Sequence, residues 1–188
     1  MISSNSLSNM VQQVKRMLTT ADLDTVLSTV AKVPDFTLTL TNIMVGGTIV
    51  KEVRLLGTPM IIIDLGDVRV GLKRAVKGVT LADIVKALSG YKSIYNKVKY
   101  KTCISPPQCE YCKPIRDFPA GLTTVCMGRD FDVYVVKYDN RFSVDINSPD
   151  GYFHINGISI YDNANIYVGI FLNTVARFMP SVWQARQL

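Results

Sequence analysis

The spacing of hydrophobic residues predicts helices at the start of the chain and strands after them. Hydrophobic residues recur at helical intervals over residues 7–18 and again over 23–30, which predicts two N-terminal helices. Thr20 is a candidate cap for the second helix, and Pro34 ends it. Over residues 36–41 hydrophobic side chains alternate with threonines, which is the pattern of a half-buried strand.

Glycine-containing turns divide the next part of the chain into further short strands, predicted over residues 48–56, 60–65 and 68–72. These connections are too short for parallel crossovers, so we expect an antiparallel meander. A central helix follows, because Thr80 and Asp83 have the spacing of a capping box and Gly90 suits a helix end.

The second half of the chain returns to alternation. Strands are predicted over residues 94–103, 122–127, 131–138, 141–147 and 152–160, with a cysteine- and proline-rich loop over 104–120 and a core helix over 164–179. The order of elements predicts an α+β fold with a mainly antiparallel sheet, N-terminal helices, one central helix and one C-terminal helix. We divide it into a helical N-terminal segment (1–34), a globular domain (35–180) and a tail (181–188).

Composition limits the partners more than it limits the fold. The chain has 188 residues, is 48% hydrophobic, and carries a net charge of +6 with a pI near 9.2. This excess of positive charge favours acidic partners such as nucleic acid, an anionic membrane surface or an acidic protein. The first ten residues lack the basic and apolar regions of a secretory signal, and residues 164–179 are shorter than the roughly 20 residues of a membrane span. We therefore expect no transmembrane segment, and at most peripheral contact with a membrane.

The positive charge is concentrated between residues 69 and 116, where eleven basic residues face only two acidic ones. On the predicted strand 94–103, Lys97, Lys99 and Lys101 would share one face about 7 Å apart. Such a row suits lipid headgroups or a nucleic-acid backbone, although a solvated face that discourages edge pairing is the simpler alternative. The candidate anion-binding residues are Arg69, Lys73, Arg74, Lys77, Lys92, Lys97, Lys99 and Lys101.

Four cysteines form the main candidate metal site. They are Cys103, Cys109, Cys112 and Cys126. The C-x2-C pair at 109 and 112 is an acceptable zinc half-site, whereas the other pair is irregular. Zinc is therefore a possible cofactor, with free thiols or disulfides as alternatives, and the lack of a secretory signal favours thiols or metal in a reducing compartment. We expect no other cofactor.

The chain lacks the common catalytic signatures. His154 is the only histidine, no nucleophile elbow surrounds a serine or cysteine, and no phosphate-binding glycine loop is present. We therefore expect a non-enzymatic protein, with a hydrolase using His154 and a cysteine as the remaining catalytic alternative.

Three segments resemble the matrix-protein domain of rhabdoviruses. A basic strand over residues 68–76 (VRVGLKRAV) runs into residues 80–91 (TLADIVKALSGY), which is similar to the front half of that domain. Residues 131–144 (FDVYVVKYDNRFSV) are compatible with its second group of strands. Together these segments cover about a third of the chain.

The resemblance implies a virion protein that self-associates as a homo-oligomer, condenses the viral nucleocapsid and lies against the inner membrane surface. Its location would be the virion and the membranes of the host cytoplasm, and the basic residues would contact lipid phosphate or ribonucleoprotein. We therefore expect a matrix-type structural protein. The alternative is a soluble RNA-binding viral regulator or suppressor of host defence, stabilised by zinc.

Overall fold

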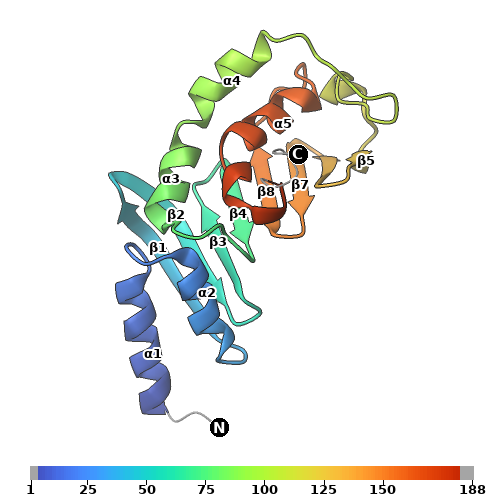
Figure 1. Ribbon diagram of the computed structural model, residues 1–188. Coiled ribbons are helices and arrows are strands. Elements are labelled where there is room, and N and C mark those ends of the chain that lie inside the picture. Colours follow the sequence, from blue (N-terminus) through green and yellow to red (C-terminus); the bar gives the residue numbers. More distant parts are fainter. Residues whose placement is uncertain (1–3, 183–188) are drawn as a thin grey trace.

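The computed structural model describes residues 4–182 of the chain (Figure 1). In chain order its helices and strands are α1 (Ser4–Met17), α2 (Leu23–Ala31), β1 (Thr37–Val45), β2 (Thr48–Leu56), β3 (Met60–Asp64), β4 (Val68–Leu72), α3 (Leu81–Ser89), α4 (Tyr91–Lys99), β5 (Gly121–Met127), β6 (Asp132–Tyr138), β7 (Arg141–Ser148), β8 (Gly151–Asn156) and α5 (Ala164–Asn173). Two short 3-10 helices, η1 (Ile115–Asp117) and η2 (Ala176–Phe178), complete the set. In Figure 1, α1 and α2 lie at one end of the molecule, and α4 with the loop after it lies at the other.

All the strands belong to one sheet in the order β1-β2-β3-β4-β8-β7-β6-β5, and every neighbouring pair is antiparallel. The first four strands form a meander from one edge to the centre. The chain then crosses through α3, α4 and a long loop to the opposite edge, and the second meander returns until β8 pairs with β4. This arrangement confirms the α+β class and the mainly antiparallel sheet.

The two faces of the sheet differ in character, because side chains of successive strand residues alternate between them. Helices α2 and α3 pack on β1 and β2, and α5 packs on β7. Residues in register on one face are buried hydrophobic side chains: Val53, Ile63, Val70, Phe153, Ile146 and Val133. The adjacent register on the opposite face is polar: Glu52, Asp64, Arg69, His154, Asp145 and Tyr134.

The N-terminal helices are part of the same core as the sheet. Val14 of α1 and Leu18, directly after it, are fully buried together with Val26 and Val30 of α2. Asp22, rather than Thr20, caps α2, because its carboxylate accepts the backbone N–H of Asp24 at 2.8 Å. At the other end the core continues to Val182, beyond residue 180 where we placed the domain boundary. Residues 1–3 and 183–188 of the predicted segments lie outside the described part of the chain.

The strand predicted over residues 94–103 is wrong. These residues belong mainly to α4 and to the loop after it, so the molecule has two central helices instead of one. Tyr91, Ile94, Tyr95 and Val98 stand at positions i, i+3, i+4 and i+7, which is one face of a helix. This longer helical pattern outweighs the short alternation of lysine with Val98 and Tyr100 on which the strand prediction depended.

The C-terminal hydrophobic stretch forms a core helix, as predicted. Ile170 and Phe171 of α5 are fully buried, and the Phe171 ring lies 5.3 Å from that of Phe131 and 5.7 Å from that of Phe153. Burial within the protein therefore accounts for its hydrophobic character. No helix within residues 4–182 is long and apolar enough to cross a membrane.

Candidate anion-binding surface

Helix α4 carries the densest group of basic side chains on one element. Its inner face holds Val98, which is buried, and the half-buried rings of Tyr91 and Tyr95. Lys92 and Lys99 are exposed on one flank of this inner face and Lys97 on the other, with Lys101 directly after the helix, and the helix contains no acidic residue. Lys97 and Lys99 are about 200° apart around a helix, so they do not share the face that the strand prediction gave them. The hydrophobic face of α4 packs on the core, so its flanking lysines are what the helix presents to an anionic partner.

A close contact with α5 fixes the position of α4. A Cβ atom added to Gly169 of α5 would lie only 2.7 Å from Cγ1 of Val98, so the glycine is what allows the two helices to approach this closely. Val98 is β-branched and cannot easily rotate away. The close packing of α4 on α5 therefore fixes the positions from which its lysines extend.

Asp162, in the segment before α5, adds polar contacts at the same place. Its buried carboxylate accepts hydrogen bonds from the hydroxyls of Tyr95 (2.6 Å) and Tyr167 (3.1 Å). Burial raises the pKa of both tyrosines, which keeps the phenols neutral and able to donate. The hydrogen bond between Lys99 and Tyr95 raises the pKa of Lys99, whose Nζ lies 5.4 Å from the centre of the Tyr95 ring. Lys99 thus keeps its positive charge at the surface.

Two large hydrophobic side chains are exposed beside these lysines. Tyr100 is 84% exposed and Ile104 is 80% exposed. Both belong to the loop that follows α4. We define the α4–loop surface as Lys92, Lys97, Lys99, Tyr100, Lys101 and Ile104. We predicted its lysines from the sequence but missed Ile104. The feature that could have identified Ile104 is that it is an isolated aliphatic residue in a cysteine- and proline-rich loop.

The loop is covalently closed by two disulfides, Cys103–Cys112 and Cys109–Cys126. This pairing differs from the thiols or zinc site that the sequence favoured. A sulfur in a disulfide is not a thiolate, the form that binds zinc, and residues 4–182 contain no group of three or more side chains suited to a metal ion. Disulfides are typical of oxidising compartments, whereas the sequence favoured thiols or metal in a reducing one.

A second basic and aromatic pair borders the loop. The Arg116 guanidinium lies 5.2 Å from the centre of the Tyr161 ring, and the Arg116 backbone N–H donates to the carbonyl of Ile160 at 2.9 Å. Tyr161 is exposed and directly precedes Asp162, the residue that anchors α4. Arg116 and Tyr161 therefore extend the cationic and aromatic character beyond the α4–loop surface, and we had not included either among the candidate residues.

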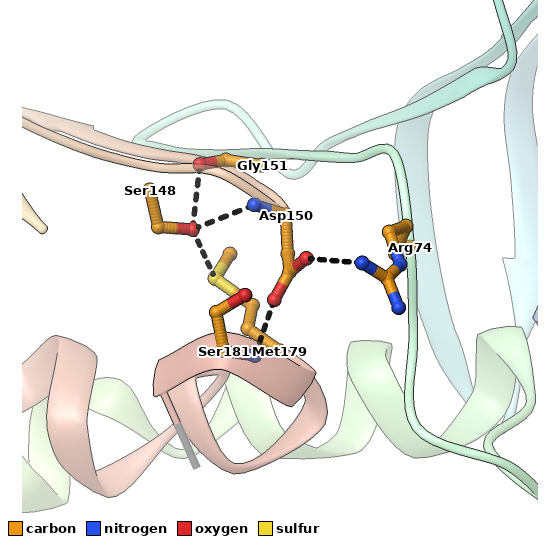
Figure 2. A network of polar contacts seen from close by, with 6 residues as sticks. All are labelled: Arg74, Ser148, Asp150, Gly151, Met179 and Ser181. Carbon is orange, nitrogen blue, oxygen red and sulfur yellow. Dashed lines mark hydrogen bonds and ion pairs between the residues drawn. The ribbon is translucent and has the colours of Figure 1, made fainter. Parts of the chain in front are cut away.

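The other predicted basic residues lie elsewhere. Arg74 makes an ion pair with the buried Asp150 at 3.9 Å, and the other Asp150 oxygen accepts the backbone N–H of Ser181 at 2.5 Å (Figure 2). The Asp150 carbonyl also accepts the N–H of Lys73 at 2.8 Å. The backbone of Lys73 and the side chain of Arg74 thus help join β4 to the β7–β8 turn and to the C-terminal segment. Lys77 lies in the loop before α3, and its neighbour Gly78 donates to Asp22.

Arg69 is separated from these residues as well. It lies on the polar face of the sheet, in register with His154 on β8. His154 in turn donates from Nδ1 to the carboxylate of Asp145 on β7. The single basic cluster predicted from the sequence is therefore divided among the α4–loop surface, the Asp150 contacts and the polar face of the sheet.

Comparison with known proteins leaves the function to be inferred from the residues themselves. No family model, curated protein or solved structure matches this chain. The similarity to the rhabdovirus matrix domain is thus a similarity of residue pattern alone.

Proposed function

We propose that this protein is a non-enzymatic, matrix-type structural protein that binds an anionic membrane surface through the α4–loop surface. The observation that carries the proposal is the position of Tyr100 and Ile104. Both are exposed, and both lie within three residues of Lys101 in the sequence. Lysines attract anionic headgroups, and an aromatic and an aliphatic side chain beside them can enter the headgroup region.

The size of the effect suits a reversible peripheral contact. A lysine near an anionic leaflet contributes about 1 kcal/mol, so the four lysines of the surface contribute on the order of 4 kcal/mol. That corresponds to roughly a thousandfold in affinity. Because charges near the membrane are screened beyond about 8 Å at physiological ionic strength, the contribution should fall as salt is raised.

The wider role follows the matrix-type resemblance. In this proposal the protein self-associates beneath the membrane and contacts the viral ribonucleoprotein with a part of its surface that faces away from the lipid. It needs no cofactor, and it acts in the virion and at membranes of the infected cell. The uncovered polar face of the sheet and its β1 edge leave surface for such contacts.

Liposome flotation tests the membrane contact. Wild-type protein should float with vesicles that contain phosphatidylserine, should not float with neutral vesicles, and should be released by salt. The variant Lys97→Glu/Lys99→Glu/Lys101→Glu should bind at least about 100-fold more weakly, since three favourable charges become repulsive. Ile104→Ser should weaken binding in a way that added salt does not reproduce.

The matched control is Lys15→Glu/Lys32→Glu/Lys51→Glu. It makes the same change in net charge at exposed lysines of α1, the end of α2 and β2. If both triple variants lost binding equally, the loss would be due to overall charge alone, and the assigned surface would be overturned. Failure of the wild type to bind anionic vesicles, together with salt-sensitive binding of single-stranded RNA, would favour the RNA-binding regulator instead.

A further inference from the structure

The polar face of the sheet contains a pocket that the proposed membrane contact does not use. It has a volume of about 730 Å³, within the usual range for small-molecule sites. Strands β4, β6, β7 and β8 form it, together with the turn between β6 and β7 and the segment after β8. The residues on which the argument depends are Arg69, Tyr138, Arg141, His154, Asn156 and Ile158.

Arg69 supplies an unsatisfied cationic donor to this pocket. Its Nε atom is buried and has no hydrogen-bond partner among residues 4–182. Asp64, its neighbour in register on β3, accepts a hydrogen bond from the Gly66 backbone at 2.7 Å. Buried donors in folded proteins almost always have a partner, and an arginine fork matches the oxygens of a phosphate. The open donor therefore indicates an anionic ligand.

His154 lies beside Arg69, with its ring held in a defined orientation. Because an ionised carboxylate only accepts, the hydrogen bond to Asp145 is donated by Nδ1 of His154. Nε2 of the neutral ring is then an acceptor, which suits a hydroxyl or amino group of a ligand and not a phosphate oxygen. The same bond engages the acidic side chain nearest to His154 in the sheet register.

The rest of the lining suits a ligand with a flat body. Arg141, Asn140 and Asn156 add a second cation and two amides, whereas Val136, Phe142 and Ile158 add hydrophobic surface. Tyr138 also lines the pocket and is 56% exposed, so its ring is accessible for stacking. A phosphate alone would use the cations but neither the hydrophobic surface nor the aromatic ring.

We propose that this pocket binds a nucleoside phosphate. The phosphate is held by Arg69 and Arg141, and the base stacks on Tyr138. The nucleotide is either free or one unit of a single-stranded RNA. A smaller cavity of about 220 Å³ shares Asn156 and Ile158 with the pocket and is lined by Lys92, which gives a longer chain a cationic path away from it.

Calorimetric titration with adenosine monophosphate, and separately with inorganic phosphate, tests the proposal. Wild-type protein should bind the nucleotide more tightly than phosphate. Arg69→Met should weaken binding of both ligands about tenfold or more, because it removes the charged donors and roughly keeps the length of the side chain. Tyr138→Ala, at the exposed rim, should weaken binding of the nucleotide and leave binding of phosphate unchanged. This variant tests the proposal if Arg69→Met fails to fold.

The matched control is Arg54→Met, an arginine on β2 that pairs with Glu52 at 2.9 Å and does not line the pocket. It should bind both ligands as the wild type does. Competition of a short single-stranded RNA with the nucleotide would identify an RNA unit as the ligand, and its absence would identify the free nucleotide. Wild-type protein that binds neither nucleotide nor phosphate, or Arg69→Met that binds as well as wild type, would overturn the proposal.

The two proposals fail separately. Lys97→Glu/Lys99→Glu/Lys101→Glu should leave nucleotide binding unchanged, and Arg69→Met should leave vesicle flotation unchanged. Loss of flotation alone would therefore count against the α4–loop surface and not against the pocket.

Discussion

Asp162 shows how much one buried side chain can position. Its carboxylate accepts from Tyr95 on α4 and Tyr167 on α5, and its backbone carbonyl accepts the N–H of Ile115 at 2.9 Å. The residue thus joins two helices to the end of the disulfide-closed loop. Nothing in its local sequence distinguishes it from a turn aspartate, because its three partners lie on separate elements and meet only in the folded chain.

We expect Asp162→Ala to lower the free energy of unfolding by about 2–4 kcal/mol, since two phenol donors lose a charged acceptor. It should also weaken binding to anionic vesicles, because α4 loses a fixed contact. Urea denaturation monitored by circular dichroism measures the first effect. Asp162→Asn keeps one acceptor oxygen, so its free energy of unfolding should fall by less. Tyr95→Phe should lower the free energy of unfolding by about 1 kcal/mol. Stability of the alanine variant equal to that of the wild type would remove Asp162 from this role.

At the scale of elements, the sequence was most informative where hydrophobic periodicity was long. The N-terminal helices, the capping box of α3 and the four-strand meander β1–β4 are confirmed. α4 was missed because the strand prediction depended on the alternation over residues 97–101 alone. The helical face of α4 begins earlier and spans residues 91–98. A period of 3.6 and a period of 2 cannot be separated over five residues, and the packing of Val98 against Gly169 decides between them.

The cysteine-rich loop is the other element that the sequence left open. Spacing alone does not determine which cysteines meet, because the pairing of Cys109 with Cys126 needs the loop to lie beside β5. The disulfides give the loop a fixed shape in the absence of helix or strand along most of its length. Ile104 owes its exposed position to this closed loop.

Thiol chemistry checks the pairing directly. In denaturant without reductant, iodoacetamide should modify none of the four cysteines, and after reduction it should modify all of them, as counted by mass spectrometry. Each disulfide should contribute about 3 kcal/mol through the loop it closes. Cys103→Ser/Cys112→Ser should weaken vesicle binding because the loop that holds Ile104 is freed. Full alkylation of the unreduced protein would contradict both disulfides.

For the whole molecule, the decisive feature is a sheet covered by helices on one side only. The sequence predicts the class of the fold, because alternation and short turns determine antiparallel pairing. It does not predict that β8 pairs with β4, since that contact joins residues about 80 positions apart. The division of the basic residues among three places follows from this pairing, which puts Arg69 on the polar face and away from α4.

The loop around Cys109 covers part of the β5 edge of the sheet, whereas the β1 edge gives the proposed self-association a physical basis. β1 is nine residues long and contains no charged side chain, whereas natural edge strands are usually protected by lysine, proline or short length. Two copies could pair β1 to β1 in antiparallel fashion around a twofold axis. We expect the mass measured by light scattering to rise from monomer towards dimer as concentration increases.

Thr39→Lys/Thr41→Lys should abolish this increase, because both threonines are exposed and the lysines of the two copies would lie close together across the axis. The control places two lysines on the opposite edge, at the exposed positions Leu122 and Thr124 of β5, as Leu122→Lys/Thr124→Lys. It should dimerise as the wild type does. A wild-type protein that stays monomeric at every concentration, or a dimer lost only in the β5 variant, would refute pairing through β1.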